Sequence, residues 1–594
     1  MSASSSSTNR WKWRALAVIP ILLLSLGPQI HFWLERGSQW HGAYATLNAD
    51  EFLYSGYVNA LIEGRPRRCD PFTGRDHQLL ETAFSIQVVP SFVLSSIARI
   101  LGLSASTTFI ALAAAAGLLA SLAVFWLLFS ITSDHRLAAA GVLFVLLTGT
   151  IFAGQGLIGV LLKLDIVSLG LPFLRRYQPA APFFLFFIFC TFIWRALTTD
   201  NSLRARLQAL LAGLSLAILV FSYLYLWSAA LAWSACVGLL WLLLRPAGQR
   251  RQSLEVFAIV SVMFALAVVP YAYLVSNRSR TLDELQTLIS THRPDLFRLP
   301  EIIGALIVVI LIVCIRRNKV QTSDSRVIFA GSFALLPFIV FNQQVLTGRS
   351  MQPFHFESFI VNYVVLVGAV ILASLLWQNI PRRTLLWVAS LCILLGVVEV
   401  ELVAGPFSRT DTAKDEMIPV LRRLDQLPAQ NGSAVFSPYL ELNQILPTWT
   451  RHGTLLAIGA IDFGSASHEE RKEFLYTHLY YSGATAERLR ALFNGIPEEL
   501  GLSYYVKYAT FGHERVRPLY ALDFHPLTQD EIETEVNAYA KFVDTFSREQ
   551  ALKHPLTYAI ADEKFDFNRV DRWYERNAGE RVGTYTLYQL NLRK

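Results

Sequence analysis

The sequence predicts a mainly α-helical membrane protein, a bundle of about 13 transmembrane helices followed by a smaller α/β domain. Hydrophobic residues make up 53% of the 594 residues and charged residues only 16%, too little polar surface for a soluble globule. Apolar runs of spanning length recur from residue 15 to residue 404. From residue 405 to 594 charged residues become frequent and no such run occurs, which indicates a separate water-soluble domain.

The N-terminal segment 1–14 is expected to be a disordered cytoplasmic tail, because it is Ser-rich and ends in basic residues. The apolar run at 15–34 is long for a signal peptide and lacks a small-residue cleavage site. We therefore expect it to be an uncleaved first span.

Apolar stretches of about 17 to 25 residues are the candidates for membrane crossings. They lie at 15–34, 84–103, 107–130, 137–154, 157–173, 181–197, 207–224, 226–245, 255–276, 299–316, 327–342, 357–377 and 384–404. Lys163 and Asp165 interrupt the segment 157–173, for which a re-entrant loop is the alternative.

Basic residues orient the bundle, because short cytoplasmic loops carry an excess of Lys and Arg. With a cytoplasmic N-terminus, four basic loops become cytoplasmic: 195–206, 245–251, 316–326 and 377–383. The loops 35–83, 174–180, 277–298 and 343–356 and the domain 405–594 then lie on the extracytoplasmic side. We expect a multi-pass protein of a bacterial inner membrane or plasma membrane.

The first external loop, 35–83, contains a predicted amphipathic helix that ends at Gly64-Arg65-Pro66. Its two faces are aromatic or apolar (Tyr54, Tyr57, Val58, Leu61) and polar (Ser55, Asn59, Glu63). The helix is too short to span, so we expect it to lie along the membrane interface.

Asp50 and Glu51 stand at the start of this helix. One interpretation is that they cap the helix and complement its dipole, an effect worth about 1 kcal/mol. The other is that one of the carboxylates acts as a general base, which typically contributes roughly 10²–10⁴ in rate.

These features resemble the GT-C class of membrane glycosyltransferases. The similar features are an acidic residue just after the first span, a helix along the membrane with a Tyr, a Gly-x-Pro-like exit and an apolar segment after Asp70-Pro71-Phe72. Such enzymes transfer a sugar from a polyprenyl-phosphate donor, with inversion, outside the cytoplasm. The resemblance implies a transferase that acts on a hydroxyl of a lipid, glycan or protein, with the donor lipid and the bilayer as partners. It also implies that Asp50 is the base, with Glu51 as the alternative, and that Tyr54 of the helix takes part in substrate binding.

Two basic segments fall on the predicted external side, where basic residues are disfavoured. Arg175 and Arg176, followed by Tyr177, are expected to grip an anionic lipid head group, because a guanidinium can make two charge-assisted hydrogen bonds to a phosphate. Snorkelling at a helix end is the alternative. The segment 277–280 is a weaker candidate of the same kind.

The loop 342–357 is rich in hydrogen-bonding side chains for a short connection between spans. Arg349 is expected to neutralise the donor phosphate, and His355 and Glu357, with Gln352, to orient the sugar or the phosphate. An ordinary hydrated loop is the alternative interpretation.

Several classes of function lack support in the sequence. There is no Walker loop, no GxGxxG after a strand and no Asp-x-Asp, so an ATPase, a dinucleotide enzyme or a nucleotide-sugar transferase is not indicated. The net charge of +7 is not gathered into a stripe, and no nucleic-acid partner is expected. We expect no cofactor, although Asp50 and Glu51 are oxygen ligands of the kind that divalent metals prefer.

Two other functions stay open. An inactive scaffold with the same helical body is compatible with the sequence, because a fold does not dictate a function. A transporter would favour charges inside the membrane, and only Lys163 and Asp165 offer them.

The domain 405–594 is expected to alternate strands and helices. The strand-like runs are 434–437, 455–458, 556–560 and 584–590, and the helical patterns are 469–481, 485–494 and 531–546.

Overall fold

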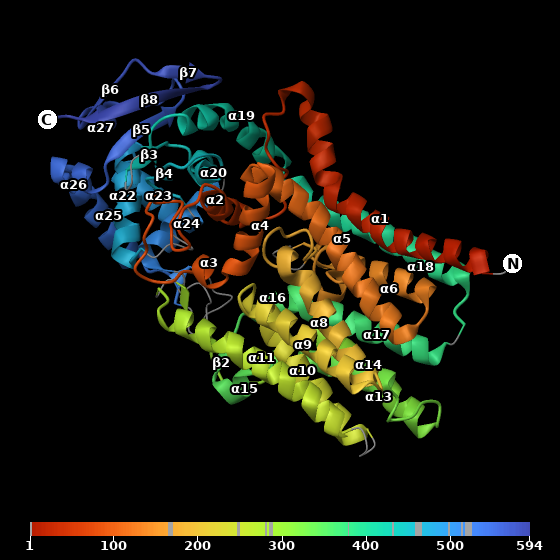
Figure 1. Cartoon of the computed structure of the whole chain (residues 1–594). Helices are drawn as coiled ribbons and strands as arrows, with labels where there is room; N and C mark the ends of the chain where they lie inside the picture. The colour runs from red at the N-terminus through yellow and green to blue at the C-terminus, as the bar shows by residue number, and fades with distance from the viewer. Residues whose placement is uncertain are drawn as a thin grey trace.

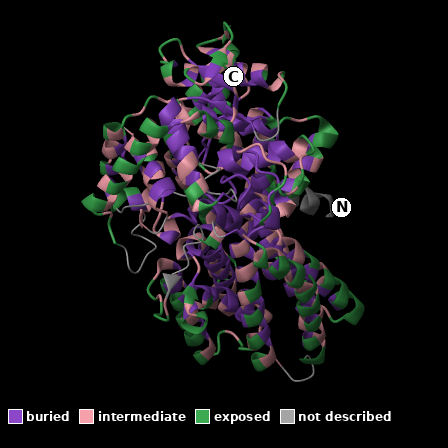
Figure 2. Cartoon of the chain, turned by 90° about the vertical axis from the view of Figure 1, so that its left-hand side faces the viewer, coloured by how far each residue is buried: buried purple, intermediate pink, exposed green. Residues whose placement is uncertain are grey.

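The predicted fold class is confirmed: the chain is mainly helical, with a bundle of apolar helices and a C-terminal domain that contains a sheet (Figure 1). The structure is a computed structural model that describes residues 3–163, 170–245, 250–279, 282–283, 289–377, 379–429, 433–457, 466–496, 499–512, 515–516 and 525–594. Figure 2 shows exposed residues on the outward faces of the peripheral helices and buried residues in the interior. Many of those exposed residues are apolar, as expected of a surface in contact with lipid.

Within these ranges, ten helices are long and apolar enough to cross a membrane. These ten helices correspond to α1 (Ala3–Arg36), α5 (Ala105–Thr132), α8 (Ala180–Thr198), α9 (Ser202–Val220), α10 (Leu224–Leu244), α11 (Arg250–Ser276), α13 (Leu299–Arg316), α14 (Ser325–Val340), α17 (Asn362–Leu376) and α18 (Arg382–Ala404). An apolar but shorter helix, α6 (His135–Thr148), lies between α5 and α8 in the sequence. Two short elements precede α17: α16 (Pro353–Phe356) and a π-helical turn (Glu357–Val361).

One end of the bundle, called the basic end below, gathers the predicted cytoplasmic loops. The guanidinium of Arg382, at the start of α18, lies over the Trp13 ring near the start of α1, 5.8 Å from its centroid. The start of α9 meets the start of α11 through an Arg206–Glu255 ion pair of 3.0 Å. Arg245, which follows α10, donates a 2.7 Å hydrogen bond to the carbonyl of Ser323, just before α14. The four basic loops thus lie at one end, as expected.

The opposite end, called the domain end, carries the connections between the other helix ends and is continuous with the C-terminal domain. It holds α2 (Glu51–Ile62), α3 (Ala83–Ile86), α4 (Val88–Leu101), a 3₁₀ turn (Ile151–Ala153), α7 (Leu157–Leu161), β1 (Ile289–Ser290), α15 (Gln344–Thr347) and β2 (Arg349–Ser350). A 3₁₀ turn (Gly37–Gln39) follows α1, and another (Gly405–Phe407) joins α18 to the domain.

The predicted span at 84–103 is wrong. Its helix, α4, has 14 residues, about 21 Å at 1.5 Å per residue, against a hydrocarbon core of about 30 Å. Both of its ends lie at the domain end: the amide of Val89 donates to the carbonyl of Phe221 after α9, and Ser106, just beyond α4, donates to the carbonyl of Gly42.

The predicted span at 157–173 is also wrong as one continuous helix, and residues 164–169 of this segment lie outside the described residues. Helix α7 ends at Leu161, Lys163 has a φ of 51°, and Asp165 lies outside the described residues. The buried Glu399 carboxylate of α18 accepts hydrogen bonds from Thr150 (2.9 Å) and from the amide of Leu157 (2.8 Å).

Helix α6 also has 14 residues but joins the two ends: Leu137 lines a cavity with Pro381 near the basic end, and Thr150, just after α6, binds Glu399 at the domain end. With α6 and the ten long helices, eleven segments run between the two ends, which is an odd number like the predicted thirteen.

The N-terminal tail also differs from the prediction of disorder, because α1 begins at Ala3 and continues to Arg36. Adding residues to an existing helix costs far less than nucleating one, so an apolar span can extend into the Ser-rich segment before it.

The C-terminal domain is built around a twisted sheet with the strand order β4-β3-β5-β8-β6, and β7 also pairs with β8. β3 is parallel to β4 and β5, and β8 is antiparallel to β5, β6 and β7. The strands are β3 (Ala434–Phe436), β4 (Gly453–Thr454), β5 (Leu556–Ala561), β6 (Tyr574–Arg576), β7 (Glu580–Val582) and β8 (Tyr585–Leu592). Three of the four predicted strand runs are found; at 455–458 the strand lies earlier, at β4, and Ile458 is outside the described residues.

Helices cover both faces of this sheet, because alternate residues of a strand point to opposite sides. Val435 packs with α19 and α20, whereas its neighbours Ala434 and Phe436 pack with the helices that follow β4. The helices are α19 (Ser408–Asp425), α20 (Leu440–Trp449), α22 (His468–Tyr481), α23 (Ala486–Asn494), α24 (Leu500–Phe511), α25 (Gln529–Thr545), α26 (Arg548–Lys553) and α27 (Asn568–Asp571). Phe52 of α2 joins the α19–α20 side, which fixes the domain to the bundle next to Asp50 and Glu51.

Candidate functional site

Helix α2 is buried between the bundle and the C-terminal domain, so the prediction that it lies along the membrane interface is wrong. Its residues 51–60 are all buried. The polar face meets α20 instead of water: Ser55 shares a 2.7 Å hydrogen bond with Thr448, and the Asn59 amide donates to the carbonyl of Pro447 at 3.1 Å. The amphipathic pattern is real, but protein groups satisfy its polar side.

The end of α2 follows the prediction. Gly64 has a φ of +85°, a left-handed conformation that glycine adopts without a steric penalty. The amide of Arg65 donates to the carbonyl of Ala60 at 3.0 Å, which closes the helix as a Schellman motif does. The chain leaves α2 in a fixed direction here.

Asp50 is held by an arginine and does not cap the helix. Its side chain makes no capping hydrogen bond, and it accepts a hydrogen bond from Arg175. Arg175 is buried, whereas the Asp50 side chain keeps 38% of its surface exposed. The guanidinium therefore fixes the carboxylate from inside the protein and leaves part of it accessible.

Glu51 forms an ion pair with Arg176, the arginine next to Arg175, deep inside the protein. Its Oε1 lies 3.3 Å from Nε of Arg176, and its Oε2 accepts a 3.3 Å hydrogen bond from the amide of Leu47. Both side chains are almost fully buried. Burial raises the pKa of Glu51 from its usual 4.5 to about 7, although Arg176 works in the opposite direction.

The raised pKa of Glu51 predicts a pH dependence of stability. The folded chain binds this proton more tightly than the unfolded chain, so the stabilisation is complete below pH 4.5 and is lost as the pH rises through about 7. The melting temperature in detergent should fall across this window in the wild type. In Glu51→Gln, which cannot ionise, the fall should be smaller. Identical pH profiles for the two proteins would contradict this assignment.

The two arginines and Tyr177 do not snorkel; they form one buried unit with α2. The rings of Tyr54 and Tyr177 are stacked with centroids 4.6 Å apart. The Arg175 guanidinium donates a 3.1 Å hydrogen bond to the carbonyl of Gln178. The Gln178 amide in turn donates to Gln87 at 2.6 Å. The four predicted residues Asp50, Arg175, Tyr54 and Tyr177 thus lie together.

The loop 342–357 approaches the same place through Phe359, in the π-helical turn. The Phe359 ring contacts the Arg175 guanidinium at 4.8 Å and stacks on the His355 ring at 5.4 Å. The His355 ring also meets the ring of Tyr225 at 4.5 Å, and the Tyr225 hydroxyl donates to Gln352 at 3.3 Å. His355 and Gln352 therefore lie next to Arg175 and the residues grouped with it. The contact runs in part through the rings of Phe359 and Tyr225, which the sequence analysis did not identify.

Glu357 is engaged elsewhere. It accepts a 2.7 Å hydrogen bond from Arg298, which also pairs with Asp295 at 2.7 Å. This pairing ties the start of α13 to the turn before α17. Glu357 thus has a partner, Arg298, that the sequence did not indicate.

Arg349 is exposed on β2 and lines a cavity of about 340 Å³ at the domain end. None of the carboxylates in the described ranges forms an ion pair with it. Arg278 and Asp283 also line this cavity, and they form an ion pair of 2.6 Å. The remaining walls are mostly apolar or neutral polar: Ile86, Gln87, Leu224, Tyr271, Val275 and Met351.

A chain of hydrogen bonds connects this cavity to the Asp50–Arg175 pair. Gln87 lines the cavity and accepts the hydrogen bond from Gln178, whose carbonyl accepts from Arg175. A molecule with an anionic group and an apolar chain fits the combination of arginines and apolar walls.

Helix α19 of the C-terminal domain fixes the segment that leads to Asp50. The Lys414 ammonium donates to the carbonyl of Tyr44 (2.6 Å), to Thr46 (2.7 Å) and to Asp411 (2.9 Å), and all of these groups are buried. The Asp415 carboxylate accepts hydrogen bonds of 3.0 Å from the amides of residues 41 and 43. The sequence analysis did not identify these residues, because a charge pattern on a helix usually indicates a solvated face.

Each carboxylate of this site has an arginine as its partner. Asp50 pairs with Arg175, and Glu51 pairs with Arg176. Among the described residues, no three His, Cys, Asp or Glu side chains gather in a way that could hold a metal ion.

No protein-family model matches the chain, and no curated protein matches its sequence. Solved structures of similar shape include ArnT from Cupriavidus metallidurans in the apo state, with 12% identity, a TM-score of 0.46 and coverage of 99% of this chain and 98% of that chain. The same protein bound to undecaprenyl phosphate matches with 12% identity, a TM-score of 0.43 and coverage of 96% and 97%. The oligosaccharyltransferase of Archaeoglobus fulgidus in the apo form matches with 12% identity, a TM-score of 0.42 and coverage of 95% and 73%. Similarity at this level assigns no role to any residue, so the function is inferred from the site.

Proposed function

We propose that this chain is a membrane glycosyltransferase of the GT-C class, which moves a sugar, with inversion, from a polyprenyl-phosphate donor to an acceptor hydroxyl. One observation supports it: the partly exposed Asp50, held by Arg175, is linked through Gln178 and Gln87 to a cavity that combines arginines with apolar walls. We put the reaction on the extracytoplasmic side, because the basic loops lie at the opposite end of the bundle and short cytoplasmic loops are enriched in Lys and Arg.

Asp50 is the general base in this proposal. Its carboxylate removes the proton of the acceptor hydroxyl as the oxygen attacks the anomeric carbon of the sugar. The hydrogen bond from Arg175 orients the carboxylate, and the exposed part of Asp50 is what an acceptor could reach. Glu51, which has no exposed surface, supports Asp50 by fixing Arg176 and the start of α2.

The cavity lined by Arg349 and Arg278 is the proposed donor site. As the bond between the sugar and the phosphate breaks, negative charge develops on the departing polyprenyl phosphate. A guanidinium stabilises such charge with two parallel hydrogen bonds. Arg349 is suited to this role because no described carboxylate competes for it. The apolar walls suit the first units of the isoprenoid chain.

Binding of undecaprenyl phosphate to the purified protein in detergent tests the donor site. A charge-assisted hydrogen bond contributes about 1.5–3 kcal/mol, so Arg349→Gln should weaken binding by about tenfold or more. Arg293→Gln is the matched control, because Arg293 is exposed at the same end but does not line the cavity. Equal affinity of wild type and Arg349→Gln would remove this cavity as the phosphate site.

A further inference from the structure

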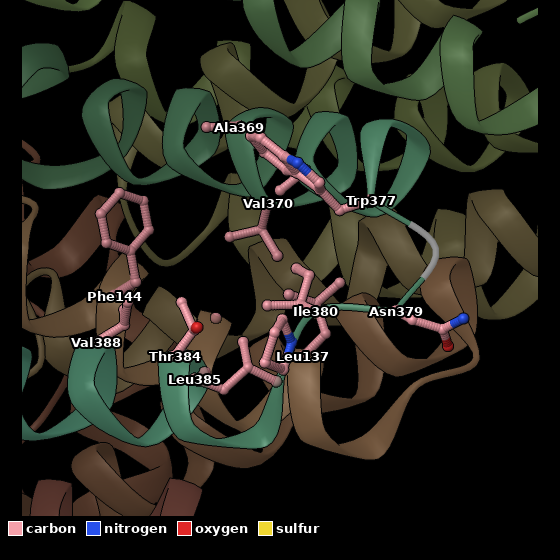
Figure 3. A pocket seen from close by; sticks show the side chains of 14 residues that line it. Leu137, Phe144, Ala369, Val370, Trp377, Asn379, Ile380, Thr384, Leu385 and Val388 are labelled. Atoms are coloured by element: carbon pink, nitrogen blue, oxygen red, sulfur yellow. The ribbon is translucent and has the colours of Figure 1, made fainter. Parts of the chain in front are cut away.

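A second cavity, of about 440 Å³, lies between α6, α17 and α18, close to the basic end and away from Asp50. Figure 3 shows Leu137 and Phe144 of α6, Val370 of α17 and Leu385 of α18 around the space between the three helices. Its lining is apolar except for Asn379 and Thr384. The reaction proposed above uses none of these residues.

This cavity reaches the outer surface of the bundle and the level of the membrane interface. Trp377, Thr384 and Val388 line it and are exposed. Tryptophan is enriched at the boundary between hydrocarbon and head groups, and Trp387, one turn along α18, is exposed as well. From Trp377 the lining continues along α17 to Ala369, about 12 Å at 1.5 Å per residue, toward the hydrocarbon core.

Water does not occupy an apolar cavity of this kind, because it would lose its hydrogen bonds there. An empty one would also cost the lining its dispersion contacts. In a bilayer, the molecule at hand to fill an apolar cavity that opens outward is a lipid chain.

The charge at the opening of the cavity favours a lipid with an anionic head group. Arg382 and Arg383 stand between the lining residues Pro381 and Thr384, and both are exposed. No carboxylate within the described ranges pairs with either arginine. Two arginines at the cytoplasmic level of a membrane attract anionic lipids. We infer that this cavity is a binding site for one acyl chain of an anionic phospholipid, whose head group lies on Arg382 and Arg383.

Lipid retention tests this site. The protein is reconstituted with equal amounts of palmitoyl-oleoyl phosphatidylglycerol and phosphatidylethanolamine, extracted gently and examined by native mass spectrometry. Wild type should retain phosphatidylglycerol in preference to phosphatidylethanolamine. The variant Arg382→Gln/Arg383→Gln should bind phosphatidylglycerol less tightly by on the order of tenfold. Ala373→Phe, which places a ring in the cavity from α17, should abolish retention.

The matched control is Arg316→Gln/Arg317→Gln, a second exposed basic pair at the basic end, where α13 ends. It should keep wild-type retention. An equal loss in this control would mean that bulk charge holds the lipid and would overturn the site. Equal retention of both lipids by wild type, or unchanged retention in the Arg382→Gln/Arg383→Gln variant, would overturn it too. The exposed arginine variants keep the test decisive even if Ala373→Phe fails to fold.

Discussion

Replacing Asp50 by Asn is expected to reduce sugar transfer by roughly 10²–10⁴, the usual contribution of a positioned general base. The amide has nearly the shape of the carboxylate and can still accept the hydrogen bond from Arg175, so the fold should be unchanged. It cannot take up the acceptor proton. Transfer is measured as release of undecaprenyl phosphate from a panel of undecaprenyl-phosphate-linked pentoses and hexoses, with a membrane lipid extract as acceptor.

Asp76→Asn is the matched control for this experiment. Asp76 lies in the same loop, its side chain is 37% exposed, close to the 38% of Asp50, and it also pairs with an arginine, Arg65, at 2.7 Å. We expect it to keep wild-type transfer. If Asp50→Asn transfers sugar normally while Glu51→Gln does not, the two carboxylates have the opposite roles; if both variants transfer normally, neither is the base.

Replacing Lys414 by Met should destabilise the protein by about 3–5 kcal/mol, because removing one partner of a buried ion pair leaves the other charge uncompensated. Lys414 and Asp411 are 3% and 4% exposed, and the ammonium also binds Tyr44 and Thr46. The effect should appear as a lower midpoint of unfolding in denaturant or on heating. Because Thr46 precedes Asp50 by only four residues, transfer activity should fall as well.

Two further variants distinguish the loss of the buried Lys414–Asp411 pair from the loss of an ion pair in general. Lys553→Met breaks an exposed pair with Glu473 and should change stability by at most about 1 kcal/mol. In the double variant Lys414→Met/Asp411→Asn no charge is left alone, so it should recover much of the lost stability. A Lys414→Met protein as stable as wild type would show that α19 does not anchor the segment before Asp50.

The helical bundle could be predicted because its signal is local. Long apolar runs identify α5 or α11 without any knowledge of their neighbours. The same criterion failed at α4 and at 157–173, where the helices have only 14 and five residues although their apolar side chains, such as Ile100 and Leu161, are exposed. Hydropathy does not show whether an exposed apolar helix crosses the membrane or ends on the side where it began.

The residues at the candidate site could be found, but their pairing could not. Acidic residues after the first span and arginines on the side where they are disfavoured both stand out in the sequence. That Arg175 binds Asp50, 125 residues away, follows only from the packing of α2 against the loop before α8. The pairing also changes their roles, because Arg176 holds Glu51 and is not available to a head group.

Other residues that support the candidate site have almost no recognisable signal in the sequence. Lys414 lies 370 residues from Tyr44, and nothing in the pattern of α19 distinguishes it from a solvated lysine. Phe359 and Tyr225 looked like ordinary residues of apolar spans. Glu399 did carry a signal, since a carboxylate inside an apolar span needs a partner; it binds the turn before α7.

A structure of the protein with undecaprenyl phosphate bound is the most direct test of the central idea, that Asp50 and the cavity at the domain end form one active site. We expect the phosphate to lie within hydrogen-bonding distance of Arg349 or Arg278, with the isoprenoid against the apolar walls and the Asp50 carboxylate facing the phosphate. A phosphate bound at the basic end, or at the domain end with Asp50 turned away from it and sealed from solvent, would contradict this account.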